Sequence, residues 1–181
     1  MGSAGTQIIL LCAIKERGIV MKHNVYLMCG IPGSGKSSFA NKYSGARSKV
    51  VSRDRIRFEL VKPDEPYFSK EKQVFNQFVE EINCALACGY DVYVDATHIS
   101  IASRNKIIRQ LNKCNLACIW LDTPLQECIK RNEDRKGTRA FVPPNVITDM
   151  YDKFQKPELY EGFEKIHIVR PDEPIITIKG E

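Results

Sequence analysis

The stretch GIPGSGKS, which starts at Gly30, combines glycines with a lysine and a serine in the order G-x-x-x-x-G-K-S. Gly30, Gly33 and Gly35 let the chain turn tightly and point its backbone N–H groups at an anion. A following helix adds its partial positive charge, Lys36 reaches the β- and γ-phosphates, and the Ser37 hydroxyl ligates Mg²⁺. The stretch follows a predicted strand and opens a predicted helix, as this motif requires. It predicts a nucleoside triphosphate site made of Gly30, Gly33, Ser34, Gly35, Lys36, Ser37 and Ser38.

A second group of charges follows the next apolar run, where Asp54 stands among Arg53, Arg55 and Arg57. Phosphoryl transfer to an alcohol needs a carboxylate that orients the hydroxyl and takes its proton. Arg57 lies three residues after Asp54, so the two share one face of a helix, and a guanidinium binds phosphate well. These residue types predict an acceptor that itself bears a phosphate. The alternative interpretation is a surface cluster of ion pairs.

Asp95 ends the apolar run DVYVD, which predicts a third acid at a strand end. Such an acid binds Mg²⁺ directly or through water in many proteins with this phosphate loop. It could instead order the acceptor pocket, and the residues alone leave both roles open. The predicted metal ligands are therefore Ser37 and Asp95.

Four further positions have two interpretations each. His98 could touch the substrate, although a loop histidine is more typical of polar surface. Asp122 fits a strand-end or helix-cap residue. Tyr67 and Phe68, in a proline-rich stretch, could stack on a nucleobase or pack against the fold.

The segment KRNEDRKGTR concentrates basic residues late in the chain. Arg131 and Arg135 are four residues apart and face one way on a helix, while Gly137 and Pro143 mark its mobile end. A segment of this kind can close over a triphosphate and neutralise charge in the transition state. The sequence predicts a lid at about 128–144, and the alternative is a solvated basic helix end.

Short apolar runs alternate with helical patterns throughout the chain, which indicates an α/β fold with a mainly parallel sheet. We expect five strands and a helical lid, arranged as a three-layer sandwich of the P-loop NTPase type. Functional residues should gather at the carboxyl ends of the strands. We divide the chain into an N-terminal extension of unclear role, 1–23, and one domain, 24–181. The strands are expected at 25–29, 49–52, 91–95, 116–122 and 165–169, with 174–179 as a candidate sixth. The helices are expected at 36–43, 53–61, 69–88, from Ser100 or Ser103 to about Lys113, 124–135 and 143–154.

The composition favours a globular protein without a membrane span. The chain has 181 residues, a net charge of +5, 43% hydrophobic and 27% charged residues. Its longest candidate apolar run, 8–14, is too short to cross a bilayer. The seven cysteines form no CxxC pair, which favours buried thiols in a reducing cytosol over a disulfide framework or a zinc site. We therefore expect a cytoplasmic protein.

The stretches GIPGSGKSS, SRDRIR, DATH and KRNEDRKGTRAFVP, in this order, resemble the kinase domain of phage-type polynucleotide 5′-kinases. The resemblance covers roughly 24–155. That family transfers the γ-phosphate of ATP to the 5′-hydroxyl of DNA or RNA, so the resemblance implies ATP and Mg²⁺ as cofactors and a polynucleotide 5′ end as partner.

The resemblance also implies a role for each matching residue. Asp54 corresponds to the general base, and Arg57 to the residue that holds the phosphate on the 3′ side of the acceptor. Asp95 corresponds to the acid that orders the acceptor pocket. Arg131 and Arg135 correspond to lid arginines on the ATP phosphates.

The chain also departs from this family. It has no D-x-D-G-T signature, so 3′-phosphatase activity is not expected. One additional residue between Arg135 and Gly137 leaves open which basic side chain points at ATP. Related P-loop domains phosphorylate other hydroxyls, so a kinase of a small-molecule or tRNA-linked hydroxyl remains an alternative. An ATP-binding regulatory module with little transfer activity is another.

Overall fold

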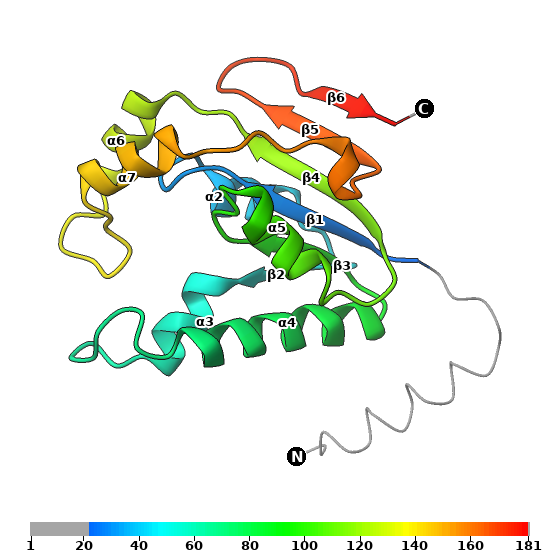
Figure 1. Cartoon of the computed structure of the whole chain (residues 1–181), viewed down its shortest axis with the longest axis horizontal. Helices are drawn as coiled ribbons and strands as arrows, with labels where there is room; N and C mark the ends of the chain where they lie inside the picture. The colour runs from blue at the N-terminus through cyan, green and yellow to red at the C-terminus, as the bar shows by residue number, and fades with distance from the viewer. Residues whose placement is uncertain (1–21, 181) are drawn as a thin grey trace.

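The computed structural model describes residues 22–180, in which strands and helices alternate as expected. The predicted extension, 1–23, lies almost wholly outside the described residues. The strands are β1 Asn24–Cys29, β2 Ser48–Ser52, β3 Asp91–Asp95, β4 Asn115–Leu121, β5 Lys165–Val169 and β6 Ile176–Lys179. The five parallel strands of the central sheet, β1 to β5, have their carboxyl ends at the same edge of the sheet (Figure 1).

The sheet has six strands in the order β2-β3-β1-β4-β5-β6, so the expectation of five is wrong by one. The first five are parallel, and β6 pairs with β5 in the antiparallel direction. The candidate sixth strand at 174–179 is therefore real. Ile176 and Ile178 are exposed, because β6 is an edge strand and packs little of its surface. That exposure explains why its pattern is weaker than that of the buried strands.

The helices form the layers on either side of the sheet. On one face, alternate residues of β1, Val25 and Leu27, pack with the long helix α4 and with α5. On the other face, Met28 packs with Ala40 of α2. In Figure 1, α4 runs beside β2 and β3, while α6 and α7 lie together at the end of the sheet. The helices are α2 Lys36–Tyr43, α3 Arg53–Leu60, α4 Glu71–Ala87, α5 Ile101–Ile108, α6 Leu125–Glu133 and α7 Pro144–Asp152, with a short 3-10 turn, η2, at Leu159–Glu161.

Helix ends differ from the expected ones by a few residues. The start expected at Ser69 is wrong, since the Ser69 N–H donates to the carbonyl of Pro66 in a turn that precedes α4. Helix α6 ends at Glu133, so Arg131 is helical and Arg135 lies in the turn beyond it. Among residues 22–180, none of the helices is long and apolar enough to cross a membrane.

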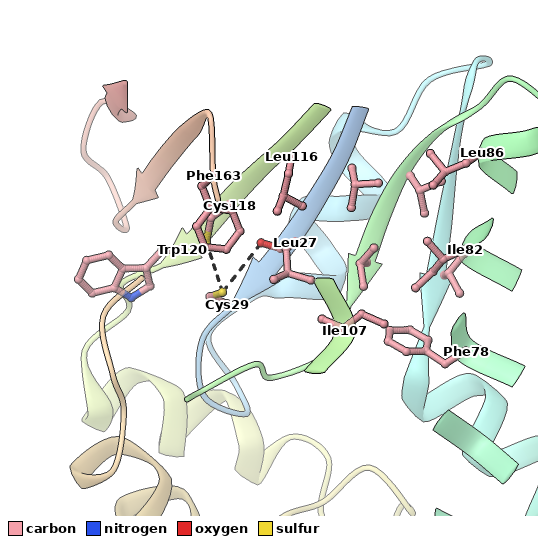
Figure 2. Packing of buried hydrophobic residues seen from close by; sticks show 14 of the residues in the cluster. Leu27, Cys29, Phe78, Ile82, Leu86, Ile107, Leu116, Cys118, Trp120 and Phe163 are labelled. Atoms are coloured by element: carbon pink, nitrogen blue, oxygen red, sulfur yellow. Dashed lines mark hydrogen bonds between the residues drawn. The ribbon is translucent and has the colours of Figure 1, made fainter. Parts of the chain in front are cut away.

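The core contains cysteines, although not all of those expected to be buried. Cys29 and Cys118, from the neighbouring strands β1 and β4, have their sulfur atoms 3.3 Å apart beneath Phe163 and Trp120 (Figure 2). Cys84 and Cys88 are exposed, so their predicted burial is wrong. The buried stripe of α4 repeats every four residues, and both cysteines fall two residues off it, on another face. The stripe is Val74, Phe78, Ile82 and Leu86.

Candidate active site

The loop between β1 and α2 depends on glycine at two positions. Gly33 has φ +82°, and a Cβ there would lie 2.2 Å from the carbonyl oxygen of Cys128 in α6. Gly30 has φ +149°, and a Cβ there would lie 3.0 Å from the carbonyl oxygen of Leu121. Any larger residue would therefore push the loop away from β4 and α6. The glycine spacing read from the sequence thus fits a cradle packed tightly on its neighbours.

Lys36 is the first residue of α2 and its side chain turns back into the loop. Its Nζ donates to the carbonyl of Ile31 at 2.8 Å and to Ser34 Oγ at 3.3 Å. Only 8% of the residue is exposed, and this burial lowers the pKa of Lys36 to about 8. The ammonium is therefore held within the phosphate loop, and its burial makes it easier to deprotonate.

Ser37 and Asp95 meet across the gap between α2 and the end of β3. Ser37 Oγ donates to Asp95 Oδ2 at 2.7 Å. Burial raises the pKa of Asp95, against the opposite effects of the Ser37 hydrogen bond and the Lys36 charge. A hydroxyl and a carboxylate are the hard oxygen ligands that Mg²⁺ prefers, and this ion takes its other ligands from phosphates and water. The pair fits that ion, whereas no group of three His, Cys, Asp or Glu side chains in residues 22–180 could hold a metal alone.

Asp54 lies in the first turn of α3 with its carboxylate 63% exposed. Its Oδ1 accepts from the guanidinium of Arg57, one turn further along the same helix, and from Tyr67 Oη at 3.0 Å. The predicted sharing of one helix face is confirmed by this contact. Burial and the Asp54 charge raise the pKa of Tyr67, so its phenol keeps the proton that it donates.

Arg57 is buried, which the interpretation as a surface ion-pair cluster does not explain. Besides Asp54 it donates to Glu71 Oε2 of α4 at 3.0 Å and to Tyr67 Oη at 3.2 Å. Glu71 also pairs with Arg53, so two guanidinium groups share it. Within the described residues, the buried Nε atoms of Arg53 and Arg57 have no hydrogen-bond partner. The site therefore has guanidinium N–H groups without a hydrogen-bond partner next to an acidic side chain.

The fold brings the acids and bases from separate elements together. The charges of Asp95 and Asp54 both favour the protonated form of Lys36, and that of Arg135 opposes it. Asp54 and Arg135 also act on Asp95, in opposite directions. The charges of Asp54 and Arg135 therefore both act on Lys36 and Asp95 at the carboxyl edge of the sheet.

Arg131 and Arg135, the arginines of the predicted lid, line an open cavity of about 630 Å³ beside the phosphate loop. Arg131 donates through Nε to Glu127 at 2.8 Å, and a Cβ on Gly35 would lie 3.5 Å from its NH1. Arg139 is turned elsewhere, with bonds to the carbonyls of Phe58 and Val61 in and after α3. The cavity is lined by loop, lid and sheet-edge residues, among them Ser38, Phe39, Tyr43, Arg131, Arg135, Val169, Arg170 and Ile175.

His98 is buried, so its expected position on a polar surface is wrong. Its Nδ1 bonds to the carbonyl oxygen of Met28 at 2.8 Å, which ties the loop after β3 to β1. Burial lowers the pKa of His98 to about 4. Asp122 follows β4 directly and pairs with Arg170 at 2.8 Å, as a strand-end residue.

Two residues of the site escaped the sequence analysis. Glu71 reaches Arg53 and Arg57 only because α4 packs on α3, and no spacing along the chain signals that contact. Thr123 is buried, and its Oγ1 donates to the carbonyl of Ser34 at 3.0 Å, bracing the phosphate loop. Because Thr123 follows the end of β4, the rule that sites gather at strand ends could have identified it.

Comparison with known families gives one match. A family model described as an AAA domain matches residues 25–157, which includes the phosphate loop, Asp54, Asp95 and the lid. No curated protein matches the chain.

The chain is similar in fold to solved structures of several different proteins. One is a chain of the Pnkp1/Rnl/Hen1 RNA repair complex, with 24% identity and a TM-score of 0.63 over 77% of this chain and 46% of that chain. This chain therefore spans about half the length of that relative. A gluconokinase from Sinorhizobium meliloti 1021 has 19% identity and a TM-score of 0.57, over 84% of this chain and 85% of that chain. The Mycobacterium tuberculosis APS kinase CysC, in complex with AMPPNP and APS, has 22% identity and a TM-score of 0.57, over 84% and 90%. At such identities these likenesses show the fold alone.

Proposed function

The chain belongs to the AAA domain family and has the α/β fold of P-loop kinases, and we propose that it transfers the γ-phosphate of ATP to the 5′-hydroxyl end of DNA or RNA. The observation that supports this most is the position of Asp54. Its carboxylate is exposed on α3, yet its charge reaches Lys36 and Asp95 at the phosphate loop. An acceptor resting on Asp54 would therefore face a bound triphosphate.

ATP binds with its phosphates in the glycine cradle and against the N-terminus of α2. Lys36 gives up its bonds to Ile31 and Ser34 and turns its ammonium to the β- and γ-phosphates. Ser37 and Asp95 would hold Mg²⁺, which would neutralise charge on the phosphate oxygens. Arg131 and Arg135 approach from the lid and stabilise the charge that develops during transfer.

Asp54 is the general base. Both of its bonds within the described residues end on Oδ1, so Oδ2 is the oxygen that an acceptor hydroxyl can reach. The hydroxyl oxygen bonds to the γ-phosphorus, the bond to the bridging oxygen breaks, and ADP leaves. Asp54 accepts the hydroxyl proton. Arg57 keeps the carboxylate oriented and turns its remaining donor to the acceptor's neighbouring phosphate.

A small sugar-like or phosphorylated acceptor is the second candidate. The gluconokinase and the APS kinase have the same fold and nearly the length of this chain. Asp54 would serve any alcohol equally well. A kinase of a small metabolite is expected to have a closed pocket. The Asp54 carboxylate is instead largely open to solvent, which favours the polynucleotide acceptor.

The deciding experiment measures transfer of labelled γ-phosphate from ATP to a short oligonucleotide with a free 5′-hydroxyl. We expect labelling by the wild type and its loss in Asp54→Ala, with ATP affinity retained. Asp64→Ala serves as the matched control, since Asp64 is also exposed and lies ten residues further along the chain. It should label normally.

Each other result has a distinct meaning. Intact ATP binding without labelling of any oligonucleotide would reject the polynucleotide acceptor and favour a small molecule. Loss of both folding and ATP binding in Asp54→Ala would make the aspartate structural. Full labelling by Asp54→Ala would remove it from the chemistry.

A further inference from the structure

Two aromatic rings stand in solvent next to the proposed base. Phe68 is 68% exposed and Tyr67 is 36% exposed, in the segment that joins α3 to α4. Their ring centroids are 4.8 Å apart in an edge-to-face pair. Adjacent exposed rings form an apolar patch, and such patches, unlike single exposed rings, mark binding surfaces.

The segment that presents these rings is held in one shape by its own bonds. Glu65 accepts from the backbone N–H of Lys62 at 2.9 Å and from Lys70 Nζ at 2.8 Å. Lys70 also donates to the carbonyl of Leu60 at the end of α3, at 2.7 Å. The Ser69 N–H donates to the carbonyl of Pro66 at 2.9 Å. The rings are therefore preorganised, so ligand binding would cost little conformational entropy in this segment.

Further contacts fix the positions of the two rings relative to Asp54. Tyr67 Oη donates to Asp54 Oδ1, and the Arg57 guanidinium lies 4.7 Å from the Tyr67 ring centroid and 5.5 Å from that of Phe68. The Phe58 ring packs edge-on against the Tyr67 ring, with 6.2 Å between the ring centroids. Tyr67 is thus enclosed between Phe58, Arg57 and Phe68, whereas most of Phe68 faces outward.

From this arrangement we propose that Phe68 is the stacking surface for the terminal nucleobase of the acceptor strand. The inference rests on the proposed function and deepens it, since it makes the acceptor a nucleoside end rather than a plain sugar. The base lies on Phe68 while its own 5′-hydroxyl reaches Asp54 Oδ2. Every nucleobase has a π-face, so this contact discriminates a base from no base and not one base from another. Tyr67 is a positioning residue that sets Phe68 and Asp54 at a fixed spacing.

Simple packing does not account for Phe68. A ring that served the fold would bury most of its surface, as Phe78 of α4 does. Phe68 instead forms an edge-to-face pair with Tyr67 and has the Arg57 guanidinium over its ring, while 68% of the residue stays exposed. The guanidinium beside it also favours an anionic ligand whose flat part stacks and whose phosphate is attracted, which describes a nucleotide.

The test uses two single-stranded oligonucleotides that differ only in the first nucleotide, which is either intact or abasic. We compare kcat/KM for both with the wild-type chain, Phe68→Ala and Phe68→Trp. The wild type should prefer the intact end by about tenfold. Phe68→Ala should lose about tenfold on the intact end alone, so the preference disappears, and Phe68→Trp should keep it. The KM for ATP should not change in any variant.

Tyr160→Ala is the matched control, because Tyr160 is an equally exposed aromatic (75%) on η2. It should behave as the wild type. If Phe68→Ala labels both ends like the wild type, or loses activity equally on both, the stacking proposal is wrong while the polynucleotide kinase stands. If the wild type labels neither oligonucleotide, the proposed function itself fails and the stacking proposal with it. Urea unfolding of each variant separates a lost contact from a lost fold.

Discussion

At the scale of single residues, Lys36 shows how burial prepares a charge for use. The free site holds the ammonium with one carbonyl and one hydroxyl, and burial lowers its pKa to about 8. A triphosphate brings negative charge next to Nζ and favours the protonated form. The proton affinity of Lys36 must therefore rise when ATP binds.

This predicts that ATP binding takes up a proton in mildly alkaline solution. At pH 8.5 most of the free sites have lost the Lys36 proton, and the complex regains it. At pH 7 the free site is already protonated, so binding takes up little. Calorimetric titrations at each pH, in buffers of different ionisation enthalpy, count the protons. Equal uptake at pH 7 and pH 8.5 would contradict the prediction.

Lys36→Ala tests the same residue through activity. The variant should lose at least about 100-fold in transfer rate, because the transition state loses a preorganised charge. It should also show no proton uptake at pH 8.5. Lys179→Ala, on the exposed edge strand β6, is the control and should match the wild type. Normal turnover by Lys36→Ala would remove the phosphate loop from the chemistry.

His98 links the protonation of one side chain to the stability of the fold. Its pKa is about 4 in the folded chain and near 6.5 when exposed, because burial disfavours the charged ring. Between these values the unfolded chain binds more protons, so stability falls as the pH falls from 6.5 to 4. We expect a loss of about 2 kcal/mol between pH 7 and pH 5 from this residue.

The measurement is the urea unfolding free energy at pH 7 and pH 5 for the wild type and for His98→Gln. The variant lacks the titrating ring and should lose about 2 kcal/mol less over this interval. His167→Gln, on the half-buried strand β5, should keep most of the wild-type loss. The same pH dependence in His98→Gln as in the wild type would contradict the assignment.

At the scale of elements, the side chain of Arg139 connects the turn after α6 to α3. Arg139 donates to the carbonyls of Phe58 and Val61 at 3.3 and 2.7 Å and lies over the Phe58 ring. Within the predicted lid, 128–144, Arg131 and Arg135 are the basic residues that line the cavity. Arg139 connects the predicted lid to the element that bears Asp54, so we expect movements of the two to be coupled.

We predict that Arg139→Ala frees the lid without unfolding the domain. Amides of 134–142 should exchange faster with deuterium, while the free energy of unfolding changes by about 1 kcal/mol. The KM for ATP should rise, because the lid arginines lose their fixed position. Lys136→Ala, at an exposed position of the same turn, is the control. Unchanged exchange across 134–142 would show that the Arg139 bonds do not restrain the lid.

At the scale of the whole molecule, a buried ion pair joins the segment after α7 to helix α5. Arg104 of α5 and Glu161 of η2 are fully buried and bonded at 2.7 and 2.8 Å. Arg104 also donates to the carbonyls of His98, Gln155 and Lys156. Two segments distant along the chain, 98–104 and 155–161, therefore meet at one guanidinium.

Arg104→Met should destabilise the fold by about 3–5 kcal/mol, since it leaves the Glu161 carboxylate buried and unpaired. Adding Glu161→Leu removes that charge, so the double variant should recover part of the loss. Urea unfolding of the two variants and the wild type checks both expectations. A single variant as stable as the wild type would show that the pair adds nothing to the fold.

Features that depend on local sequence patterns could be predicted from the sequence, whereas features that depend on contacts between helices and strands could not. The phosphate loop follows from a motif of eight consecutive residues, and Asp95 from an acid at a strand end. The burial of His98 and the role of Glu71 did not follow, because both depend on which elements pack together. The sixth strand was only a candidate, because its exposed pattern resembles that of a loop.

The central position of β1 bears on the order in which the chain acquires its structure. β1 pairs with β3 through Val25 and Val92, and with β4 through Asn24 and Asn115. Contacts so distant in sequence form slowly, since long loops must close first. The phosphate loop follows β1 directly in the chain, whereas Leu121 and Thr123, which lie against it, stand at and just after the end of β4. During synthesis the loop therefore lacks these neighbours until β4 has been made. A nascent chain shorter than this would have the nucleotide motif but no nucleotide site.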